Sequence, residues 1–254
     1  MKKKPSISII VPCYNEEKNI MGTVASIKEA MEETGRFAGY EILIFDDKST
    51  DRTGEIAGEL KKTEDGVKVI HNRRNMGFGY NYTEGVRLAS KEYIMMVPGD
   101  NEIPAPAIKK IFSVVGLADI IIPYTTNIEV RPPMRRIISK AFVLLFNTLF
   151  GLRLRYYNGP CVIKGAMLKK VPMTTHGFAY MASILVRLLK SGASFFEVPM
   201  EIRHRQSGTT KAFKVKNIVS VGSEILKLFW EVRVARRSLY SAAARRVDTA
   251  MPSA

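Results

Sequence analysis

Acidic side chains follow three apolar runs within the first 102 residues of the chain. The runs have the composition of buried β-strands, and the carboxyl ends of parallel strands meet at one edge of a sheet, where ligands bind. The carboxylates that this arrangement would gather on one rim are Glu16, Asp46, Asp47, Asp100 and Glu102. Crowded carboxylates repel one another unless a cation or several hydrogen-bond donors neutralise them. A hydrated metal ion that carries a nucleotide diphosphate would supply both, so the rim is a candidate site for such a pair.

The elements that would position this rim follow from the alternation of apolar runs with helical patterns. We expect strands at 6–11, 40–46, 67–71, 93–97 and 119–123, and helices at about 18–34, 51–63, 79–90 and 105–115. Alternation at this spacing predicts an α/β fold with a Rossmann-like, mostly parallel sheet and helices on both faces. A turn at Asn75-Met-Gly77 should open the third helix, where glycine lets the backbone approach a ligand closely.

The pattern changes after Pro123. We expect helices at about 136–150, 178–190 and 215–234, a strand at 194–200 and a polar loop at 204–211. No linker separates the two parts, so we expect a single domain over residues 1–235, made of the halves 1–123 and 124–235. Residues 236–254, which are rich in Ala, Arg and Ser, are expected to form a basic, flexible tail.

The charge of the chain is concentrated in its second half. Residues 1–130 carry 17 Lys and Arg against 19 Asp and Glu, a net of −2, whereas residues 131–254 carry 22 against 5, a net of +17. This asymmetry points to an anionic partner of the second half, which would be nucleic acid, a phospholipid surface or a phosphorylated substrate. Nucleic acid is disfavoured, because the sequence has no recognised reader motif and no interleaving of aromatic and basic residues.

The number of cysteines and the length of the apolar runs indicate in which cellular compartment the protein is expected. Cys13 and Cys161 are too few for a disulfide framework, so we expect two free thiols in a reducing compartment. The apolar run at 7–11 is too short for the core of a signal peptide, and the longest run, at 141–150, is too short to span a bilayer, which takes about 20 residues. We therefore expect a cytoplasmic protein whose attachment to a membrane is peripheral.

Four motifs occur in an order that is more specific than any one of them. They are Pro12-x-Tyr14-Asn15-Glu16, Asp46-Asp47-x-Ser49-x-Asp51-x-Thr53, Asn75-x-Gly77 and Asp100-x-Glu102. The set resembles the family 2 glycosyltransferases of GT-A fold, and within them the polyprenyl-phosphate sugar transferases, such as the dolichyl-phosphate mannose synthases. The resemblance implies transfer of a sugar from a nucleotide-diphosphate donor, with residues 1–123 as the nucleotide-binding half and residues 124–235 as the acceptor half.

The resemblance also implies roles for single residues. A divalent metal, Mg²⁺ or Mn²⁺, would bind at Asp100 and Glu102, although relatives usually carry Asp-x-Asp where this chain has Pro98-Gly-Asp100. Asp46 and Asp47 would meet the base and ribose of the nucleotide. The other residues assigned to the nucleotide pocket are Pro12, Tyr14, Glu16 and Gly77, and those assigned to phosphates are Arg135, Arg205 and Lys211. Catalysis would rest on Asp100 and these three cations.

Carboxylates are missing from a long part of the second half, between Glu129 and Glu197. Transfer to a sugar hydroxyl generally needs a general base. A phosphate monoester needs none, because its second pKa is about 6 and it is already a dianionic nucleophile near neutral pH. The missing base and the excess of cations together favour a polyprenyl phosphate as the acceptor in an inverting, metal-dependent transfer.

Other functions remain open on the sequence alone. The chain could use a hydroxyl of a glycan or glycolipid, or it could be a non-catalytic module of GT-A fold that binds anionic lipid through its basic half. Basic residues such as Arg131 and Arg136 are as often part of a solvated surface. The helices expected at 136–150 and 215–234 would lie on the anionic cytoplasmic face of a membrane, or would instead form ordinary core or a homo-oligomer interface.

Overall fold

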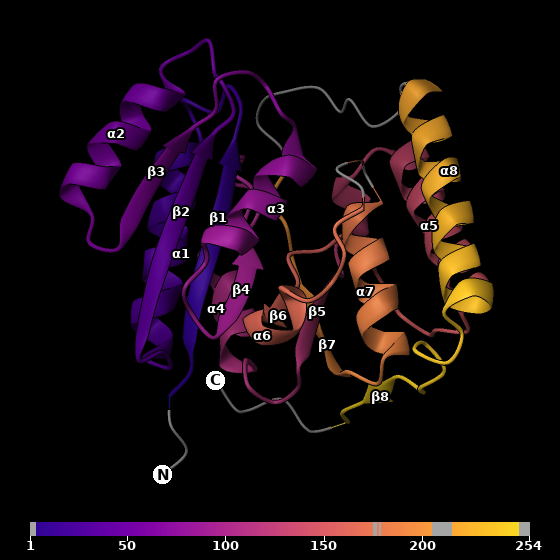
Figure 1. Cartoon of the computed structure of the whole chain (residues 1–254). Coiled ribbons are helices and arrows are strands. Elements are labelled where there is room, and N and C mark those ends of the chain that lie inside the picture. Colours follow the sequence, from indigo (N-terminus) through magenta and orange to yellow (C-terminus); the bar gives the residue numbers. More distant parts are fainter. Residues whose placement is uncertain (1–3, 175–176, 178, 205–214, 249–254) are drawn as a thin grey trace.

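One eight-stranded sheet organises the structure, a computed structural model that describes residues 4–174, 177, 179–204 and 215–248, with only the backbone described at 215–220. The order across the sheet is β3-β2-β1-β4-β6-β5-β7-β8 (Figure 1). The strands are β1 (Ser6–Cys13), β2 (Gly39–Asp46), β3 (Val67–His71), β4 (Tyr93–Met96), β5 (Ile120–Thr125), β6 (Val162–Lys164), β7 (Ser194–Met200) and β8 (Arg245–Arg246).

Strand directions bring several carboxyl ends to one edge of the sheet. The strands β3, β2, β1 and β4 are parallel, and β6 runs antiparallel to both of its neighbours, β4 and β5. Two antiparallel steps restore the original direction, so β5 and its parallel neighbour β7 point the same way as β1. The carboxyl ends of β1, β2, β4, β5 and β7 therefore share one edge, called the carboxyl edge below, where open α/β sheets bind ligands.

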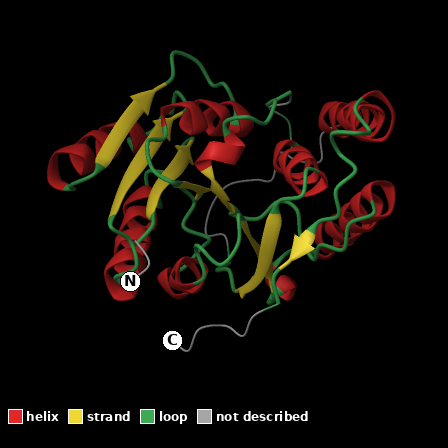
Figure 2. Cartoon of the chain, turned by 60° about the horizontal axis from the view of Figure 1, so that its bottom comes forward, coloured by secondary structure: helices red, strands yellow, loops and turns green. Residues whose placement is uncertain are grey.

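Helices cover both faces of the sheet, as Figure 2 shows. One buried cluster joins the sheet to α1 (Ile20–Thr34), α2 (Thr53–Thr63) and α4 (Ala105–Ser113). A second cluster joins the other face to α3 (Phe78–Leu88), α5 (Pro133–Phe150), α7 (Tyr180–Lys190) and α8 (Val215–Trp230). Because both faces are covered, β1 is buried at every position after its first and can be apolar along most of its length. The predicted α/β fold is confirmed.

The short elements are those that the sequence did not reveal. They are η1 (Ile128–Val130), β6, the helix α6 (Gly165–Leu168), the π-helical turn η3 (Glu231–Ala235) and β8. The longer elements lie close to their predicted positions, and α5 begins at Pro133, earlier than expected, because proline is compatible with the first turn of a helix. The expected flexible tail needs correction for residues 236–248, because Tyr240 is buried and β8 pairs with β7.

The helices α5 and α8 lie side by side at the end of the molecule farthest from β3 (Figure 1). Phe150 of α5 packs against Phe229 of α8, with ring centroids 6.5 Å apart. The exposed large apolar side chains of these two helices are Met134, Ile137, Ile138, Leu144, Leu145, Leu226, Phe229 and Trp230. We call this set the α5–α8 surface. Within the described ranges, no helix has both the length and the apolar character that crossing a membrane requires.

Candidate functional site

Three turns at the carboxyl edge carry the predicted carboxylates and are bonded to their neighbours. Asn15, after β1, accepts a hydrogen bond on Oδ1 from the Thr50 N–H (2.8 Å) and donates its own N–H to Ser49 Oγ (3.1 Å). Asn101, after β4, donates its N–H to Thr23 Oγ1 of α1 (3.1 Å). Each turn contains one non-glycine residue with positive φ, namely Asn15, Lys48 and Asn101. Such conformations cost free energy, and they are common where a binding site fixes its backbone.

Asp47 anchors the loop that precedes α3. Its Oδ1 accepts hydrogen bonds from Asn72 Nδ2 (2.7 Å) and the Met76 N–H (2.8 Å), and its Oδ2 accepts one from the Gly77 N–H (2.8 Å). Gly77 has φ of 87°, a conformation that favours glycine. The structure therefore places this carboxylate, which we expected to meet the nucleotide, in contact with the backbone of the loop that holds Gly77.

Asp46, at the end of β2, is held in a different way. Its Oδ1 accepts a hydrogen bond from the Ser49 N–H (3.0 Å), and its Oδ2 lies 3.0 Å from His71 Nδ1. Burial raises the pKa of Asp46, but the hydrogen bonds from Ser49 and His71 outweigh burial and leave the pKa below its ordinary value. Asp46 is thus an ionised acceptor on the rim, and carboxylates of this kind accept hydrogen bonds from ring N–H groups and sugar hydroxyls.

Carboxylates from the three turns converge around Cys13 at the end of β1. Burial raises the pKa of the Cys13 thiol, and the negative charges of Glu16, Asp46 and Asp100 raise it further. The Glu16 carboxylate also accepts a hydrogen bond from Asn19 Nδ2 (2.7 Å). Glu16, Asp46 and Asp100 therefore lie near enough to Cys13 for their charges to act on it, and the thiol stays protonated.

Two further residues expected in the nucleotide pocket occupy the same strand end. Pro12 is buried within β1, whereas Tyr14 is partly exposed just beyond it. The Cys13 N–H and C=O groups lie between them, and Cys13 O accepts a hydrogen bond from the Asp47 N–H (2.9 Å). The strand end is therefore tied to β2, with the Tyr14 side chain reaching the surface of the rim.

Asp100 and Glu102 stand in the turn after β4, where a metal was expected. Asp100 Oδ1 accepts a hydrogen bond from the Glu102 N–H (3.3 Å). A Cβ on Gly99 would lie 2.4 Å from Cys13 Sγ, so this turn packs directly against β1. Among the residues that the structure describes, no group of three or more His, Cys, Asp or Glu could hold a metal. Two carboxylates instead fit a hard cation that completes its shell with phosphate oxygens and water.

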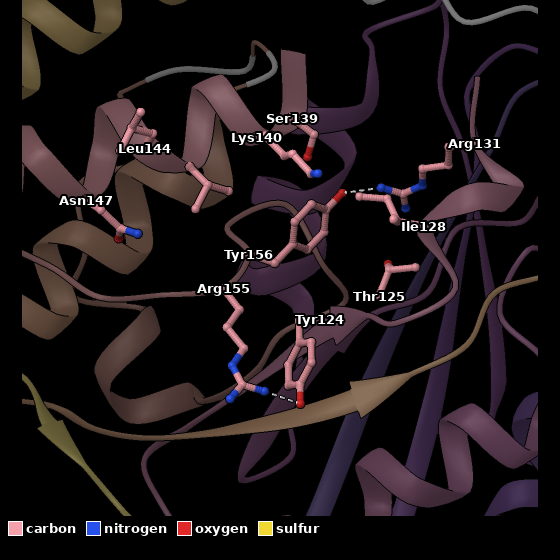
Figure 3. Close-up of a pocket in the computed structure, with 11 residues that line it drawn as sticks. Tyr124, Thr125, Ile128, Arg131, Ser139, Lys140, Leu144, Asn147, Arg155 and Tyr156 are labelled. Atoms are coloured by element: carbon pink, nitrogen blue, oxygen red, sulfur yellow. Dashed lines mark hydrogen bonds between the residues drawn. The ribbon is translucent and has the colours of Figure 1, made fainter. Parts of the chain in front are cut away.

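A cavity of about 380 Å³ opens at the carboxyl edge between the end of β5 and α5 (Figure 3). It is lined by Tyr124, Thr125, Ile128, Arg131, Ser139, Lys140, Val143, Leu144, Asn147, Arg155 and Tyr156. This lining includes three cations, an apolar wall from α5 and no carboxylate. The cavity, called the basic cavity below, therefore fits an anionic group that is joined to an apolar chain.

Tyrosines hold two of the three cations of the basic cavity. Arg131 Nη1 donates a hydrogen bond to the Tyr156 hydroxyl (2.8 Å), and the guanidinium lies 5.5 Å from the centre of that ring (Figure 3). Arg155 donates to the Tyr124 hydroxyl and lies 4.6 Å from the centre of its ring. These contacts orient the guanidinium groups without neutralising them. Arg131 Nε is buried without a hydrogen-bond partner among the described residues, a group that a bound anion would satisfy.

A short chain of hydrogen bonds joins the basic cavity to the acidic turns. Asn127, after β5, donates from Nδ2 to Ile202 O (2.9 Å) and accepts on Oδ1 from the Ile202 N–H (3.0 Å). The next residue, Arg203, donates its N–H to Glu102 O (2.8 Å) and its Nη1 to Asn101 Oδ1 (3.3 Å). The carboxyl edge is therefore one connected rim, with carboxylates at one end and cations at the other.

Of the three predicted phosphate-binding cations, only Arg135 lies among the described residues. Arg135 is half-buried near the start of α5 and does not line the basic cavity, whereas Arg205 and Lys211 lie outside the described residues. Sequence reasoning did not select Arg155 or the two tyrosines as site residues. The glycine at position 159 could have marked this loop as one that packs closely on the sheet. In the structure, a Cβ at Gly159 would lie 2.6 Å from Pro123 O at the end of β5, so there is no room for a side chain.

Comparisons with known proteins give the following matches. The model of the family described as Glycosyl transferase family 2 matches residues 8–171. Dolichol-phosphate mannosyltransferase from Pyrococcus furiosus is 28% identical over 240 residues, which cover 91% of this chain and 66% of that protein. Glycosyltransferase AglD from Haloferax volcanii is 23% identical over 242 residues, which cover 91% of this chain and 38% of that protein. The chain thus spans less than two thirds of the length of both relatives.

Polyprenol monophosphomannose synthase from Mycolicibacterium smegmatis is 26% identical over 216 residues, 80% of this chain and 79% of that protein. Among solved structures, glucosyl-3-phosphoglycerate synthase from Mycobacterium tuberculosis in complex with Mn²⁺, uridine diphosphate and phosphoglyceric acid has a TM-score of 0.63 and 15% identity, covering 89% of this chain and 78% of its own. A mycobacterial protein has a TM-score of 0.65 and 16% identity, covering 88% and 74%. These likenesses confirm the GT-A fold.

Proposed function

Because the chain belongs to glycosyl transferase family 2, we propose that it transfers a sugar from a nucleotide diphosphate to a polyprenyl phosphate. The observation that carries the proposal is the basic cavity, which places three cations and an apolar wall on the same rim as the acidic turns. A phosphate attached to an isoprenoid chain matches both parts of that lining. Two relatives, the dolichol-phosphate mannosyltransferase and the polyprenol monophosphomannose synthase, have names that state this acceptor class.

The acidic end of the rim binds the donor. Asp46 accepts hydrogen bonds from the base or ribose, and Gly77 lets its loop approach the nucleotide closely. Asp100 and Glu102 are the residues that would hold a divalent metal, Mg²⁺ or Mn²⁺, at this end of the rim. When bound, that metal would offset the negative charge that develops on the departing diphosphate. The solved neighbour that contains Mn²⁺ and uridine diphosphate supports both the metal and the nucleotide.

The basic end of the rim binds the acceptor. Arg131, Lys140 and Arg155 orient its phosphate, and the cations that the family resemblance assigns to phosphates, Arg135, Arg205 and Lys211, add positive charge. A phosphate oxygen attacks the anomeric carbon from the side opposite the diphosphate, so the configuration at that carbon inverts. The phosphate is already dianionic near neutral pH, and the reaction needs no general base, which agrees with a cavity lined by no carboxylate.

The α5–α8 surface rests on the cytoplasmic face of the membrane, from which the lipid acceptor is drawn. Leu144 lines the basic cavity and is also 69% exposed, so it marks the place where an isoprenoid chain would pass from the cavity to the bilayer. Exposed apolar side chains bury in the interface while Lys and Arg attract anionic headgroups. The net charge of +17 on residues 131–254 suits such a surface.

A transfer assay with matched acceptors tests the proposal. The full chain is given nucleotide-diphosphate sugars and Mg²⁺ or Mn²⁺, with either a polyprenyl phosphate or the polyprenol of the same length. We expect transfer to the phosphate alone. Arg131→Ala and Arg155→Ala should each raise the KM for the phosphate by about tenfold or more, because each removes a charge-assisted contact.

The matched control is Arg153→Ala, an exposed arginine two residues from Arg155 that does not line the cavity. This variant should keep the parental KM, and all three variants should bind the nucleotide as the parent does. Comparable transfer to the polyprenol, or an unchanged phosphate KM in both cavity variants, would contradict the proposed acceptor.

A further inference from the structure

The segment after η3 folds back along the outer edge of the sheet instead of leaving the domain. Tyr240 is buried, and its hydroxyl donates a hydrogen bond to Glu231 (3.0 Å). The Ala242 N–H donates to Lys190 O (3.1 Å), and the Val247 N–H donates to Phe195 O (2.8 Å). The strand β8 is therefore a fixed outer strand beside β7, as Figure 2 shows, and it brings Arg246 opposite the side chains of that strand.

Glu197 of β7 connects this outer strand to the basic cavity. Its side chain is 1% exposed. One oxygen, Oε1, accepts a hydrogen bond from the Arg155 N–H (2.7 Å). The other oxygen, Oε2, has no hydrogen bond among the described residues and lies 3.4 Å from Arg246 Nη1. One buried carboxylate thus holds the cavity loop with one oxygen and faces a guanidinium of the C-terminal strand with the other.

We propose that Arg246 is a positioning residue for the basic cavity, acting through Glu197 on the loop that carries Arg155 and Tyr156. The inference rests on the proposed function, because it is the acceptor phosphate that this loop would bind. Arg246 is itself held in place, since its Nε lies 3.0 Å from Asp248 Oδ1.

The loop is sensitive to this anchor because it supplies part of both arginine–tyrosine pairs. Arg155 rests on Tyr124, and the next residue, Tyr156, holds Arg131. A shift of the Arg155 backbone therefore moves both pairs at once. The Glu197 bond is made to the backbone N–H of Arg155, so it fixes the position of the loop without neutralising the Arg155 guanidinium.

Loss of the Arg246 charge would leave a buried carboxylate without its cation. Such a group is costly, and it relaxes by taking up water or by turning toward another cation. The Arg155 guanidinium belongs to the residue that Glu197 already contacts, so an unpaired Glu197 competes with Tyr124 for that guanidinium. Either response loosens the cavity loop. Replacing Glu197 by Gln removes the charge but keeps a carbonyl oxygen that can accept the Arg155 N–H.

Four variants of the full chain separate this coupling from a general loss of stability. They are Arg246→Met, Glu197→Gln, the double variant, and the control Arg245→Met, whose arginine is the other residue of β8 and donates to Gly192 O. Hydrogen–deuterium exchange over residues 152–158 reports the loop, calorimetry with geranylgeranyl phosphate reports the cavity, and calorimetry with nucleotide diphosphate reports the acidic end. We expect Arg246→Met to speed exchange and to weaken geranylgeranyl phosphate binding about tenfold.

The double variant should recover binding to within about twofold of the parent, and Arg245→Met should match the parent throughout. Nucleotide affinity should be unchanged in all four. Parental exchange and binding in Arg246→Met would overturn the proposal, and so would a double variant that stays as impaired as Arg246→Met, because Arg246 would then act without Glu197. A parent that binds no geranylgeranyl phosphate would refute the proposed acceptor, and with it the role of Arg246 in binding that acceptor. The exchange data would still decide whether Arg246 holds the loop.

Discussion

The acidic end and the basic end of the carboxyl edge orient their charged groups through different kinds of contact. At the acidic end, carboxylates accept hydrogen bonds from backbone N–H groups of nearby turns, as Asp47 does from Met76 and Gly77. At the basic end, guanidinium groups rest on tyrosine rings and donate to their hydroxyls, as Arg131 does to Tyr156. The acidic turns after β1 and β2 are bonded to each other within the first half of the chain, whereas the basic cavity draws its lining from β5, α5, the segment between them and the loop before β6.

This difference has a chemical consequence. Backbone N–H groups stabilise the ionised form of a carboxylate and fix its direction, so the acidic end is prepared to accept a metal and hydrogen-bond donors. A tyrosine ring orients a guanidinium while leaving its charge available, so the basic end is prepared for an anion. We therefore expect substitutions at the acidic end to change donor binding and substitutions at the basic end to change acceptor binding, with little effect across the rim.

The largest effect should come from Asp100→Asn at the acidic end. Under the proposed function, loss of this carboxylate should weaken binding of the metal that would offset charge on the leaving diphosphate, and a group that stabilises such charge is worth a factor of about 10³ in turnover. Calorimetry should show that nucleotide binding no longer responds to a chelator. Asp65→Asn, at an exposed aspartate beside β3, is the control and should behave as the parent. If nucleotide affinity is equally insensitive to chelator in the parent, the metal assignment is wrong.

A smaller but still large effect is expected from Arg205→Ala and Lys211→Ala. Both residues lie outside the described part of the chain, and the prediction rests on their position in the Arg205-to-Lys211 motif. Removing one charge-assisted phosphate contact should lower turnover by about 10- to 100-fold. Steady-state rates with a polyprenyl phosphate measure the loss. Near-parental rates in both variants would show that this loop does not hold phosphate.

The same comparison explains which parts of the site could be predicted from sequence. Each acidic residue stands at or shortly after the end of an apolar run, so local pattern and the geometry of parallel strands were sufficient to predict that Asp46 and Asp100 lie at one edge of the sheet. The basic cavity depends instead on pairs that are distant in sequence, since Arg131 and Tyr156 are 25 residues apart and Arg155 and Tyr124 are 31 apart. No periodicity connects such residues.

The short elements could not be predicted from the sequence for a related reason. The two residues of β8 have no apolar alternation and are exposed, so only their pairing with β7 makes them a strand.

Because residues 236–248 pack on the domain, deleting the C-terminal segment is a poor test of its role in membrane binding. Deleting residues 236–254 would remove Tyr240 and Arg246 from the domain, so a loss of membrane binding could reflect damage to the fold.

Point substitutions on the α5–α8 surface are the sharper test. Leu144→Glu and Leu226→Glu replace side chains that are 69% and 72% exposed, so the fold should tolerate both. Each should weaken binding to anionic liposomes by about tenfold, since burying a leucine contributes about 1.5–3 kcal/mol and the new charge repels the surface. Co-sedimentation across a salt series measures binding, and Leu88→Glu on α3 is the control.

The only tryptophan of the chain, Trp230, is 62% exposed on α8 and provides a second readout. Its emission should shift to the blue when liposomes are added to the parent, because the indole enters a less polar environment. A parent that ignores anionic liposomes but sediments as a dimer that Leu226→Glu dissociates would show that a second copy covers this surface instead.

The smallest expected effect concerns acid stability and compares two carboxylates, Glu41 of β2 and Asp119 just before β5. In the first half, burial raises the pKa of Glu41, but hydrogen bonds from Lys68, Ser90 and Ser8 outweigh burial and lower the pKa to about 2. At Asp119, burial likewise opposes the bonds that lower the pKa to about 2, which come from Ser194 and Lys164 of the second half. The starting value of Glu41 is the higher of the two, so its shift is larger.

Because both carboxylates have a lower pKa in the folded state, the stability they supply is fully present above about pH 5 and is lost as pH falls toward 2. At pH 7 we expect Glu41→Gln to lower the free energy of unfolding by about 1–2 kcal/mol, a figure reduced for the solvent around Lys68, and Asp119→Asn to lower it by less. Urea unfolding between pH 7 and 3 measures both, with Glu59→Gln on the exposed side of α2 as the control. The difference between each variant and the parent should shrink as the pH falls. A difference that stays constant, or that grows, would show that these side chains stabilise the fold through packing and not through their charge.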